Sequence, residues 1–529
     1  MRISHSLDEF RALVREFEQD SRAGGTSGSL PDPAESPSND DAAATAGTLL
    51  VPIWREFLFD TETAVTAYAK LTEPPFGFLL ESVEGGEQWA RYTFVGSRPA
   101  AAWRLADGEV SWWTPESGWQ PRQVDDPLAD LDRRLRARAP VPVEGLPRFW
   151  GGAVGYLSYD VVRLIERLPD PAADDQGLPD ALLIFTDVVL ALDNLRGTAM
   201  AIAPAEIAPG AADAVLEAAY AEAVAKADAV VAKLQEGEGP TPLSLSTGRE
   251  VAYRSSMSRR EFEAGVEKIR EYILAGDAFQ VVLSQRLSLP LQSSPFDLYR
   301  TLRSLNPSPY LYFLELDGAW IAGSSPEMLV RLEDGTVTVR PIAGTRPRGK
   351  DAAEDQALAL DLEADEKELA EHRMLVDLGR NDVGRVSEYG TVSVPELMVI
   401  ERYSHVMHLV SRVEGTAREG LGAIDVLKAS FPAGTVSGAP KVRAMEIVDE
   451  LEPVRRGPYA GAVGHFSYGG ERMDTAIAIR TLVVKDGEAW VQAGAGIVAD
   501  SVPAREFEET LHKAGALLRS VAAVEGGSG

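Results

Sequence analysis

Two pairs of glutamates in the second half of the chain have a spacing that could hold a metal ion. "DEKELAEH" places Glu368 and Glu371 three residues apart, and "REFEETLHK" repeats that spacing with Glu506 and Glu509. In a helix, residues three apart project from one face. Two such helices facing each other would offer only carboxylate oxygens, the ligands that Mg²⁺ prefers. Acidic pairs also arise by chance on solvated helix faces, and the chain has 81 acids, so spacing alone leaves both interpretations open.

The histidines His405 and His408, in "RYSHVMHLVS", could suggest a second kind of metal site. No third nitrogen ligand lies nearby in the sequence, and the chain has no cysteine to complete a zinc site. A histidine beside a cleft is instead a candidate for proton transfer near neutral pH. A histidine packed in the core is the alternative.

Glycine-rich turns recur in the second half of the chain: "PIAGTRPRG" (341–349), "FPAGTVSGAPK" (431–441), "GPYAGAVG" (457–464) and "QAGAGIVADS" (492–501). None has the dinucleotide-binding or P-loop pattern. Backbone N–H groups in such turns can approach a carboxylate closely, although a single one is more often only a tight turn in a β-rich body. Arg346 and Arg348 in the first turn are expected to add local positive potential that favours an anionic ligand.

The elements that would position these residues are helices and mostly antiparallel strands in irregular alternation. Phe262, Val266 and Ile269 share the face of a helix that ends near Gly276 and leads into a strand. A helix-rich segment follows at about 353–378, and a terminal helix begins at about 503. The strict βα rhythm of a barrel or a doubly wound sheet is missing, which predicts an α+β fold with large, mostly antiparallel sheets.

Composition divides the chain into three parts. Residues 1–47 hold a short amphipathic helix over 1–18 and then a segment rich in Gly, Ser, Pro and Asp, which is expected to be disordered over 19–47. An alanine-rich helix at about 210–235 is followed by "EGEGPTPLSLSTGRE", a stretch typical of a domain boundary. The sequence therefore predicts an N-terminal domain over 48–240 and a C-terminal domain over 250–523.

The overall charge of the 529-residue chain excludes some classes of protein. Its 81 acids against 52 bases give a net charge of −29, whereas a nucleic-acid binder needs a basic face. No cysteine is present, so disulfides and thiol nucleophiles are excluded. The first residues lack the pattern of a signal peptide, and a cytoplasmic protein is expected. The acidic excess fits either a salt-rich cytoplasm that screens the charge or an ordinary acidic protein, and the melting temperature against KCl concentration distinguishes them.

Taken together and in this order, six blocks resemble the signature blocks of the chorismate-binding enzymes, and among them anthranilate synthase component I. They are "PIAGTRPRG", "DEKELAEHRMLVDLGRNDVGRV", "ERYSHVMHLVSRVEG", "FPAGTVSGAPKVRAMEIVDELEP", "RRGPYAGAVGHFSY" and "QAGAGIVADSVPAREFEE". The resemblance is close over about 250–520 and looser over about 48–200. It implies a sandwich-like core of sheets surrounded by helices, and a Mg²⁺-dependent reaction in which chorismate and ammonia give anthranilate and pyruvate, the first step of tryptophan biosynthesis.

The resemblance also assigns roles to single positions. It implies metal ligands at Glu371 and Glu509 supported by Glu368 and Glu506, chorismate contacts at Gly344, Thr345, Tyr459, Arg480, Gly494, Ala495, Gly496 and Lys513, a catalytic histidine at His408 and a general acid at Glu327. Arg480 is suited to a bidentate contact with a carboxylate. A tryptophan feedback site is implied by "LLES" and "NPSPY", with Ser82, Pro309, Tyr310 and Leu311 around the inhibitor. Residues that only pack the domain junction are the alternative for these four.

Two positions bear on which member of the family the chain resembles. Isochorismate and salicylate synthases have a lysine that activates water where this chain has Gln280, and an amide cannot act as that base. Aminodeoxychorismate synthases have a nucleophilic lysine where this chain has Ala343. Direct attack by ammonia is therefore implied, with a separate glutamine amidotransferase subunit as its source because this chain has no cysteine. An atypical aminodeoxychorismate synthase and a non-catalytic binding protein of the same fold are the alternatives.

Overall fold

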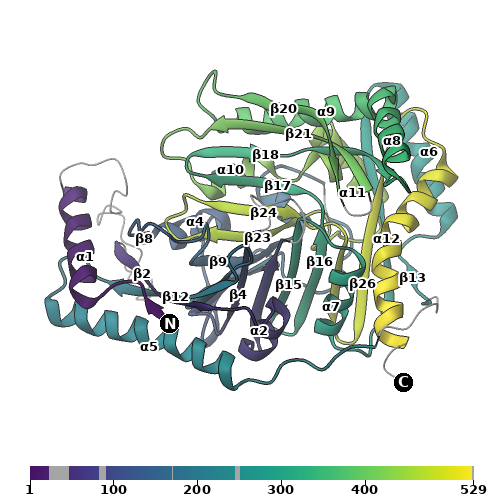
Figure 1. Cartoon of the computed structure of the whole chain (residues 1–529). Coiled ribbons are helices and arrows are strands. Elements are labelled where there is room, and N and C mark those ends of the chain that lie inside the picture. The colour runs from purple at the N-terminus through teal and green to yellow at the C-terminus, as the bar shows by residue number, and fades with distance from the viewer. Residues whose placement is uncertain (23–46, 83–90, 170, 245–250, 404–405, 527–529) are drawn as a thin grey trace.

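The computed structural model describes residues 1–22, 47–82, 91–169, 171–244, 251–403 and 406–526. Two large sheets lie face to face, and helices cover their outer faces (Figure 1). Every strand pair in the described ranges is antiparallel except β2 with β8. The predicted α+β fold with a sandwich-like core of mostly antiparallel sheets is confirmed.

The first sheet has 14 strands among the described residues. In spatial order its main path is β1 (Arg2–Ile3), β2 (Thr48–Leu58), β12 (Thr198–Ile207), β11 (Val189–Asp193), β4 (Tyr92–Ser97), β3 (Phe76–Glu81), β15 (Tyr310–Leu316), β16 (Ala319–Ser325), β25 (Thr481–Lys485), β26 (Glu488–Ile497), β14 (Gln280–Pro290) and β13 (Arg254–Ser255). Off this path, β8 (Arg138–Pro140) pairs with β2, and β22 (Gly438–Ala439) pairs with β14.

The second sheet has 12 strands in the same described part of the chain. Its order is β19 (Ile342–Pro347), β21 (Val406–Thr416), β18 (Thr336–Val339), β17 (Met328–Glu333), β24 (Met473–Ile477), β23 (Ala462–Ser467), β9 (Gly152–Leu157), β10 (Ala181–Phe185), β5 (Ala101–Ala106), β6 (Glu109–Thr114) and β7 (Gly118–Arg122), with β20 (Ser393–Arg402) beside β21. Each sheet joins strands from both sides of the boundary expected near residue 240, since β3 pairs with β15 and β9 with β23.

The helices pack on the outer faces. They are α1 (Leu7–Arg22), α2 (Ala64–Leu71), α4 (Pro127–Arg136), α5 (Asp213–Glu236), α6 (Arg259–Ala275), α7 (Pro295–Leu305), α8 (Ala352–Ala364), α9 (Glu366–Gly384), α10 (Ala423–Ser430), α11 (Lys441–Leu451) and α12 (Pro503–Gly526), with 3₁₀ turns η2 (Tyr159–Leu164) and η3 (Gly434–Val436). None in the described ranges is long and apolar enough to cross a membrane.

Local sequence signals account for several helix ends. Helix α6 begins with a capping box between Ser258 and Glu261 and stops at Gly276, whose φ of +89° suits glycine. The N-terminal helix is longer than expected, because α1 continues to Arg22. Residues 19–22 thus belong to this helix rather than to a disordered segment, while 23–46 lie outside the described residues.

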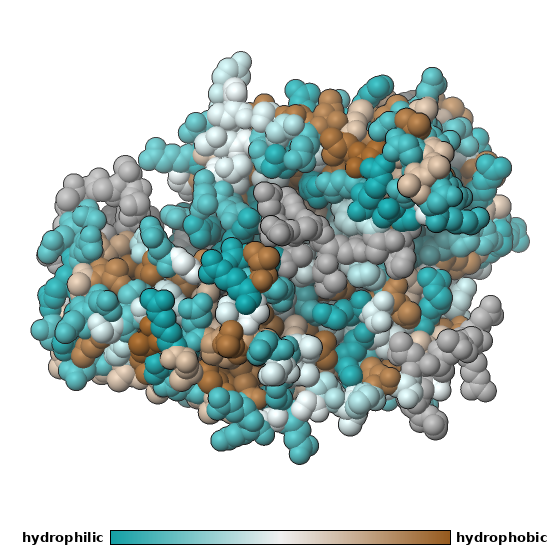
Figure 2. Space-filling view, viewed as in Figure 1, coloured by the Kyte–Doolittle hydropathy of each residue, from teal (hydrophilic) through white to brown (hydrophobic). Residues whose placement is uncertain are grey.

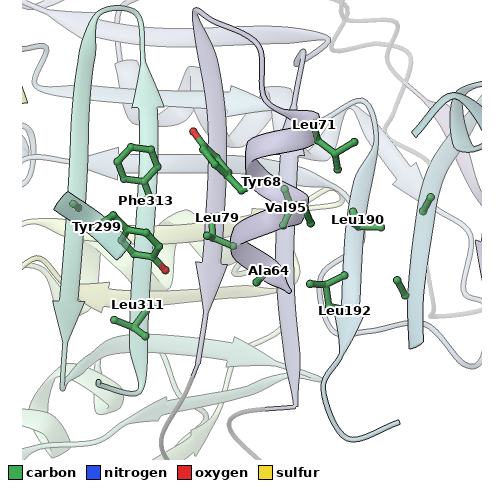
Figure 3. Packing of buried hydrophobic residues seen from close by; sticks show 14 of the residues in the cluster. Ala64, Tyr68, Leu71, Leu79, Val95, Leu190, Leu192, Tyr299, Leu311 and Phe313 are labelled. Atoms are coloured by element: carbon green, nitrogen blue, oxygen red, sulfur yellow. The ribbon is translucent and has the colours of Figure 1, made fainter. Parts of the chain in front are cut away.

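Layers of apolar side chains between the sheets and under the helices hold the fold together. The layer between the sheets includes Phe78, Tyr312 and Val463. On the outer face of the first sheet, side chains of α2 and α7 pack against β3, β4 and β15 (Figure 3). The apolar run at 181–192 supplies two strands, with β10 in the second sheet and β11 in the first. The molecular surface in the view of Figure 2 is mostly hydrophilic, which agrees with the net charge of −29.

Candidate active site

Most of the residues predicted to bind the metal and chorismate lie on two groups of elements, which a hydrogen bond joins. The first group is the start of β14, the end of β26 and the first turns of α12. The second is β19, β21 and the first turns of α9; β21 and α9 are labelled in Figure 1. The amide Nε2 of Gln280, on β14, donates to Oε1 of Glu371, on α9, over 3.2 Å. Gln280 is buried, and its Oε1 has no hydrogen-bond partner among the described residues.

The glycines of β26 let neighbouring side chains approach one face of the strand closely. A Cβ on Gly496 would lie 2.3 Å from Nε2 of Gln280, and a Cβ on Gly494 would lie 2.8 Å from the hydroxyl of Tyr459. The carbonyl of Gly494 accepts a hydrogen bond from Lys513 at 2.9 Å. The side chain of Ala495 is not brought to this face, because it packs in an apolar cluster that includes Leu283. Only the backbone of Ala495 is available to a ligand on the glycine side.

The catalytic-histidine candidate is held by the turn of β19. Nδ1 of His408 lies 3.0 Å from Oγ1 of Thr345 and 3.1 Å from the carbonyl oxygen of Gly344. Gly344 lies at an irregularity in the pairing of β19 with β21, and its φ is +60°. A Cβ there would come 2.7 Å from Leu362 and 3.2 Å from Oε2 of Glu368, so the absent side chain lets the turn approach α8 and α9. His405 lies outside the described residues.

The two arginines after this turn do not supply free positive potential, which corrects the expectation from sequence. Arg346 pairs with Asp361 at 2.7 Å and with Asp365 at 2.8 Å. Arg348 pairs with Asp355 at 2.7 Å and holds the pKa of that carboxyl at about 2. These ion pairs tie β19 to α8 and α9. The sequence did not indicate these ion pairs, because they depend on how α8 and the start of α9 fold back onto β19.

The four glutamates predicted as metal ligands occupy the first turns of α9 and α12. Burial, followed by the charge of Glu371, raises the pKa of Glu368. Burial also raises the pKa of Glu506, whereas a hydrogen bond from Ser501 and the charges of Lys367, on α9, and Lys513 act to lower it. Glu509 forms an ion pair with Lys513 at 2.8 Å.

The donor chemistry of this region fits Mg²⁺, because the four carboxylates and the unpartnered Oε1 of Gln280 are all oxygen donors. No group of three histidine, aspartate or glutamate side chains in the described ranges is close enough to hold a metal ion as the structure stands. In this arrangement Glu509 is paired with Lys513 and Glu371 accepts from Gln280. A shared metal site would require these side chains to turn toward each other.

Glu327 is a buried carboxyl in the connection from β16 to β17. Burial raises its pKa to about 7, while a hydrogen bond from Thr435, the N–H of Ile342 and the charges of Arg480 and Lys513 act in the opposite direction. Oγ1 of Thr435 donates to Oε1 of Glu327 at 2.8 Å. A carboxyl with such a pKa can give up or take a proton near neutrality.

Arg480 and Thr435 complete the surroundings of Glu327. Burial lowers the pKa of Arg480 and the charge of Glu327 raises it, yet no carboxylate in the described part of the chain forms an ion pair with its guanidinium. Arg480 is therefore available to an anionic ligand. Thr435 was not singled out from the sequence. The available signal was its hydroxyl inside the glycine-rich turn at 431–441, but nothing in the sequence indicated that it would meet Glu327.

A second pocket collects the four residues predicted around tryptophan. It lies where β3 ends and β15 begins, and it is lined by Ser82, Pro309, Tyr310 and Leu311. The Tyr310 hydroxyl donates to Asp474 at 3.0 Å, and Nε of Arg331 donates to the same carboxylate at 2.9 Å. Met328 and Ile342 also line this pocket. It thus borders the segments that carry Glu327 and the Gly344 turn.

Comparison with known proteins agrees with these features. The chorismate binding enzyme family matches residues 78–519. Anthranilate synthase component 1 of Pseudomonas aeruginosa is 51% identical over 492 residues, which cover 91% of this chain and 97% of that protein. The crystal structure of anthranilate synthase component I from Streptococcus pneumoniae superposes with a TM-score of 0.71 at 38% identity, covering 87% of this chain and 99% of that one.

A more distant structure shares the fold. The menaquinone-specific isochorismate synthase from Escherichia coli has a TM-score of 0.63 at 19% identity, covering 89% of this chain and 94% of that one. At this identity the likeness concerns the arrangement of the chain alone. The family match covers most of the chain and includes each predicted catalytic, substrate-binding and metal-ligand residue. The chain therefore belongs to the chorismate binding enzyme family.

Proposed function

We propose that the chain is the chorismate-converting subunit of an anthranilate synthase, a lyase. Chorismate and ammonia would give anthranilate, pyruvate and water, the first step of tryptophan biosynthesis. The relatives named anthranilate synthase component 1, 51% identical for the one from Pseudomonas aeruginosa, support this choice within the family. No specific observation favours the alternatives, an aminodeoxychorismate synthase or a non-catalytic binding protein.

The proposal rests above all on the amide side chain of Gln280, which a hydrogen bond holds against Glu371. An amide at this buried position cannot take a proton from water, so the site offers no lysine-type base for hydroxylation of the ring. Ala343, half-buried on β19, offers no nucleophile either. With no lysine at either position to activate water or to attack the ring, we infer that ammonia itself attacks chorismate.

Different residues would bind chorismate, hold the metal and transfer protons. We assign Arg480, Lys513, Tyr459, Thr345 and the backbone of Gly344 and Gly494–Gly496 to the binding of chorismate. Glu371 and Glu509, supported by Glu368 and Glu506, would hold Mg²⁺. When bound, Mg²⁺ would neutralise negative charge on a ring carboxylate. His408, oriented by Thr345, would assist departure of the ring hydroxyl, and Glu327 would donate the proton.

Ammonia, regulation and location complete the proposal. We propose a separate glutamine amidotransferase subunit as the source of ammonia, since no thiol in this chain can hydrolyse glutamine. The pocket of Ser82, Pro309, Tyr310 and Leu311 would bind tryptophan as a feedback inhibitor. Residues 48–240 would form the regulatory part and 250–523 the catalytic part of a cytoplasmic enzyme.

A product assay tests the proposed function. The purified chain is incubated with chorismate, Mg²⁺ and an ammonium salt at alkaline pH, where neutral ammonia is available. We expect the fluorescence of anthranilate to rise and pyruvate to appear in equal amount. A 4-amino product would support the aminodeoxychorismate alternative, isochorismate would indicate attack by water, and no turnover would favour a binding protein.

A further inference from the structure

Arg456 is a buried arginine in the connection from α11 to β23, within the block "RRGPYAGAVGHFSY". It forms an ion pair with Glu452 at 2.7 Å, and the two side chains are 1% and 5% exposed. Nε of Arg456 also donates to the second carboxylate oxygen at 2.8 Å, so the contact is bidentate. Charges buried this deeply are costly unless further hydrogen bonds surround them.

The other hydrogen bonds of Arg456 reach two segments that carry site residues. Nη1 donates to the carbonyl oxygen of Val436 at 2.6 Å, and Nη2 donates to that of Val282 at 2.8 Å. Val436 directly follows Thr435 in the turn η3. Because Thr435 donates to Glu327, the guanidinium holds the backbone next to the partner of the proposed proton donor.

The ion pair also fixes the part of β14 that pairs with the glycines of β26. Val282, which accepts from the guanidinium, is the register partner of Gly496. Oε1 of Glu452 accepts from the N–H and the hydroxyl of Ser284, both at 2.8 Å, and Ser284 is the register partner of Gly494. Both halves of the pair thus contact the strand segment opposite the backbone that is proposed to bind chorismate.

Two tyrosine rings lie against the guanidinium. Its carbon Cζ is 4.7 Å from the ring centre of Tyr159 and 5.6 Å from that of Tyr459, which is a proposed chorismate contact. Burial acts to lower the pKa of Arg456, but the charge of Glu452 outweighs it and the pKa lies above its ordinary value. The guanidinium therefore stays charged, and a charged guanidinium is attracted to the faces of aromatic rings.

We propose that Arg456 is a positioning residue for the reaction, and that it fixes Thr435 and Tyr459 beside chorismate. Glu452 supports it by holding the guanidinium in one orientation. The inference rests on the proposed function, in which Glu327 donates a proton and Tyr459 binds the substrate. Arg456 acts through its neighbours, because its hydrogen bonds in the described part of the chain all go to Glu452 and to backbone carbonyls.

Arg456→Lys tests the proposal, because it keeps the charge while one ammonium nitrogen replaces a planar fork of three nitrogens. The matched control is Arg134→Lys on α4. Arg134 pairs with Asp130 at the same four-residue spacing, the side chains are 5% and 6% exposed, and its Cζ lies 4.3 Å from a ring centre of Trp112. Trp112 belongs to β6, near the end of the second sheet that lies opposite β19.

The charges around Glu327 stay the same in Arg456→Lys. Arg480 and Lys513 act to lower the pKa of Glu327, and Arg340 and Asp382 line the same small cavity. The variant removes none of these groups and keeps a positive charge at its own position. A change in the pH at which Glu327 loses its proton therefore reports the position of the threonine that bonds to it.

The experiment measures kcat/KM for chorismate against pH, at saturating Mg²⁺ and a fixed concentration of neutral ammonia. We expect Arg456→Lys to lower the plateau at least about tenfold, because Tyr459 is misplaced. Its alkaline fall should move upward by about half a pH unit, because a displaced Thr435 bonds more weakly to the carboxylate of Glu327. Adding Arg456→Lys to Thr435→Val should move the fall no further than Thr435→Val alone, since both act through one hydrogen bond.

Melting curves show whether a variant folds. If Arg456→Lys does not fold, Glu452→Gln decides the outcome, because it keeps the shape of the side chain and removes the charge that orients the guanidinium. We expect kcat/KM for chorismate to fall at least about tenfold in Glu452→Gln. The matched control Asp130→Asn should lose stability and keep kcat/KM, and an unchanged kcat/KM in Glu452→Gln would overturn the inference.

The remaining outcomes separate the inference from the proposed function. An unmoved alkaline fall in Arg456→Lys, or an equal shift in Arg134→Lys, would assign the ion pair to stability alone and overturn the inference. A product other than anthranilate from the unaltered chain would overturn the proposed function, and the pH profile of that reaction would still test the positioning role. No turnover of chorismate by the unaltered chain would overturn both.

Discussion

Oγ1 of Thr435, a half-buried residue, donates a hydrogen bond over 2.8 Å to Oε1 of the buried Glu327. Burial alone disfavours the charged carboxylate, and the pKa of Glu327 rises to about 7 for that reason. The threonine hydroxyl stabilises the charged form and opposes the rise. The pair therefore sets the pH at which Glu327 gives up its proton.

Replacing Thr435 by valine should move the pH profile. Loss of a hydrogen bond to the carboxylate raises the pKa of Glu327, so the carboxyl stays protonated to higher pH. If Glu327 is the general acid, kcat/KM for chorismate at a fixed concentration of neutral ammonia falls as pH rises through this pKa, and that fall should shift upward by about one pH unit in the variant. Thr301→Val, at a buried threonine of α7, should leave the profile in place. An unmoved alkaline limb in Thr435→Val would show that another group controls it.

Gly344→Ala, compared with its control, distinguishes the effect of backbone strain from the effect of displacing the neighbouring helices. The φ of +60° and the close approach to Leu362 and Glu368 both oppose a side chain at this position. We expect the thermal stability to fall and kcat to fall at least about tenfold, because α9 and its glutamates must move away from the turn. Gly276→Ala is the control, since its φ is +89° but nothing lies within 4 Å of the added Cβ. It should lose about 1 kcal/mol of stability and keep its activity.

Local sequence patterns predicted which helices and strands carry the site, but they did not predict most of the contacts within it. The end of α6 was predicted correctly because Gly276 permits a left-handed conformation. The partners of Arg346 and the meeting of Thr435 with Glu327 were not readable, because each depends on how distant segments pack. Likewise, periodicity did not show that the strands at 181–192 would enter different sheets.

The glutamate pairs predict a specific response to Mg²⁺. Glu371→Gln and Glu509→Gln each remove one charged oxygen donor while keeping the shape of the side chain. We expect kcat to fall at least about a hundredfold and the Mg²⁺ concentration for half-maximal rate to rise, since carboxylate charge provides most of the affinity for this ion. Direct Mg²⁺ titration by calorimetry should show the same weakening without substrate.

Neighbouring glutamates on the same two helices serve as controls. Glu366 is exposed at the start of α9, and Glu508 on α12 pairs with Arg259 at 2.8 Å. Glu366→Gln and Glu508→Gln should keep the Mg²⁺ dependence of the unaltered chain. Full activity of Glu371→Gln at ordinary Mg²⁺ concentrations would remove this glutamate from the metal site.

Tryptophan should inhibit the enzyme through the pocket of Ser82, Pro309, Tyr310 and Leu311. Ser82→Leu adds a bulky side chain at its wall and should abolish inhibition while leaving turnover without tryptophan close to that of the unaltered chain. The rise in melting temperature that tryptophan causes by binding the folded state should disappear in the same variant. Ser111→Leu, at a half-buried serine of β6 outside the pocket, should stay sensitive to tryptophan. If tryptophan changes neither the rate nor the melting curve of the unaltered chain, these residues only pack the sheets together. If it does inhibit, Met328 and Ile342 are the residues through which the pocket borders the catalytic segments.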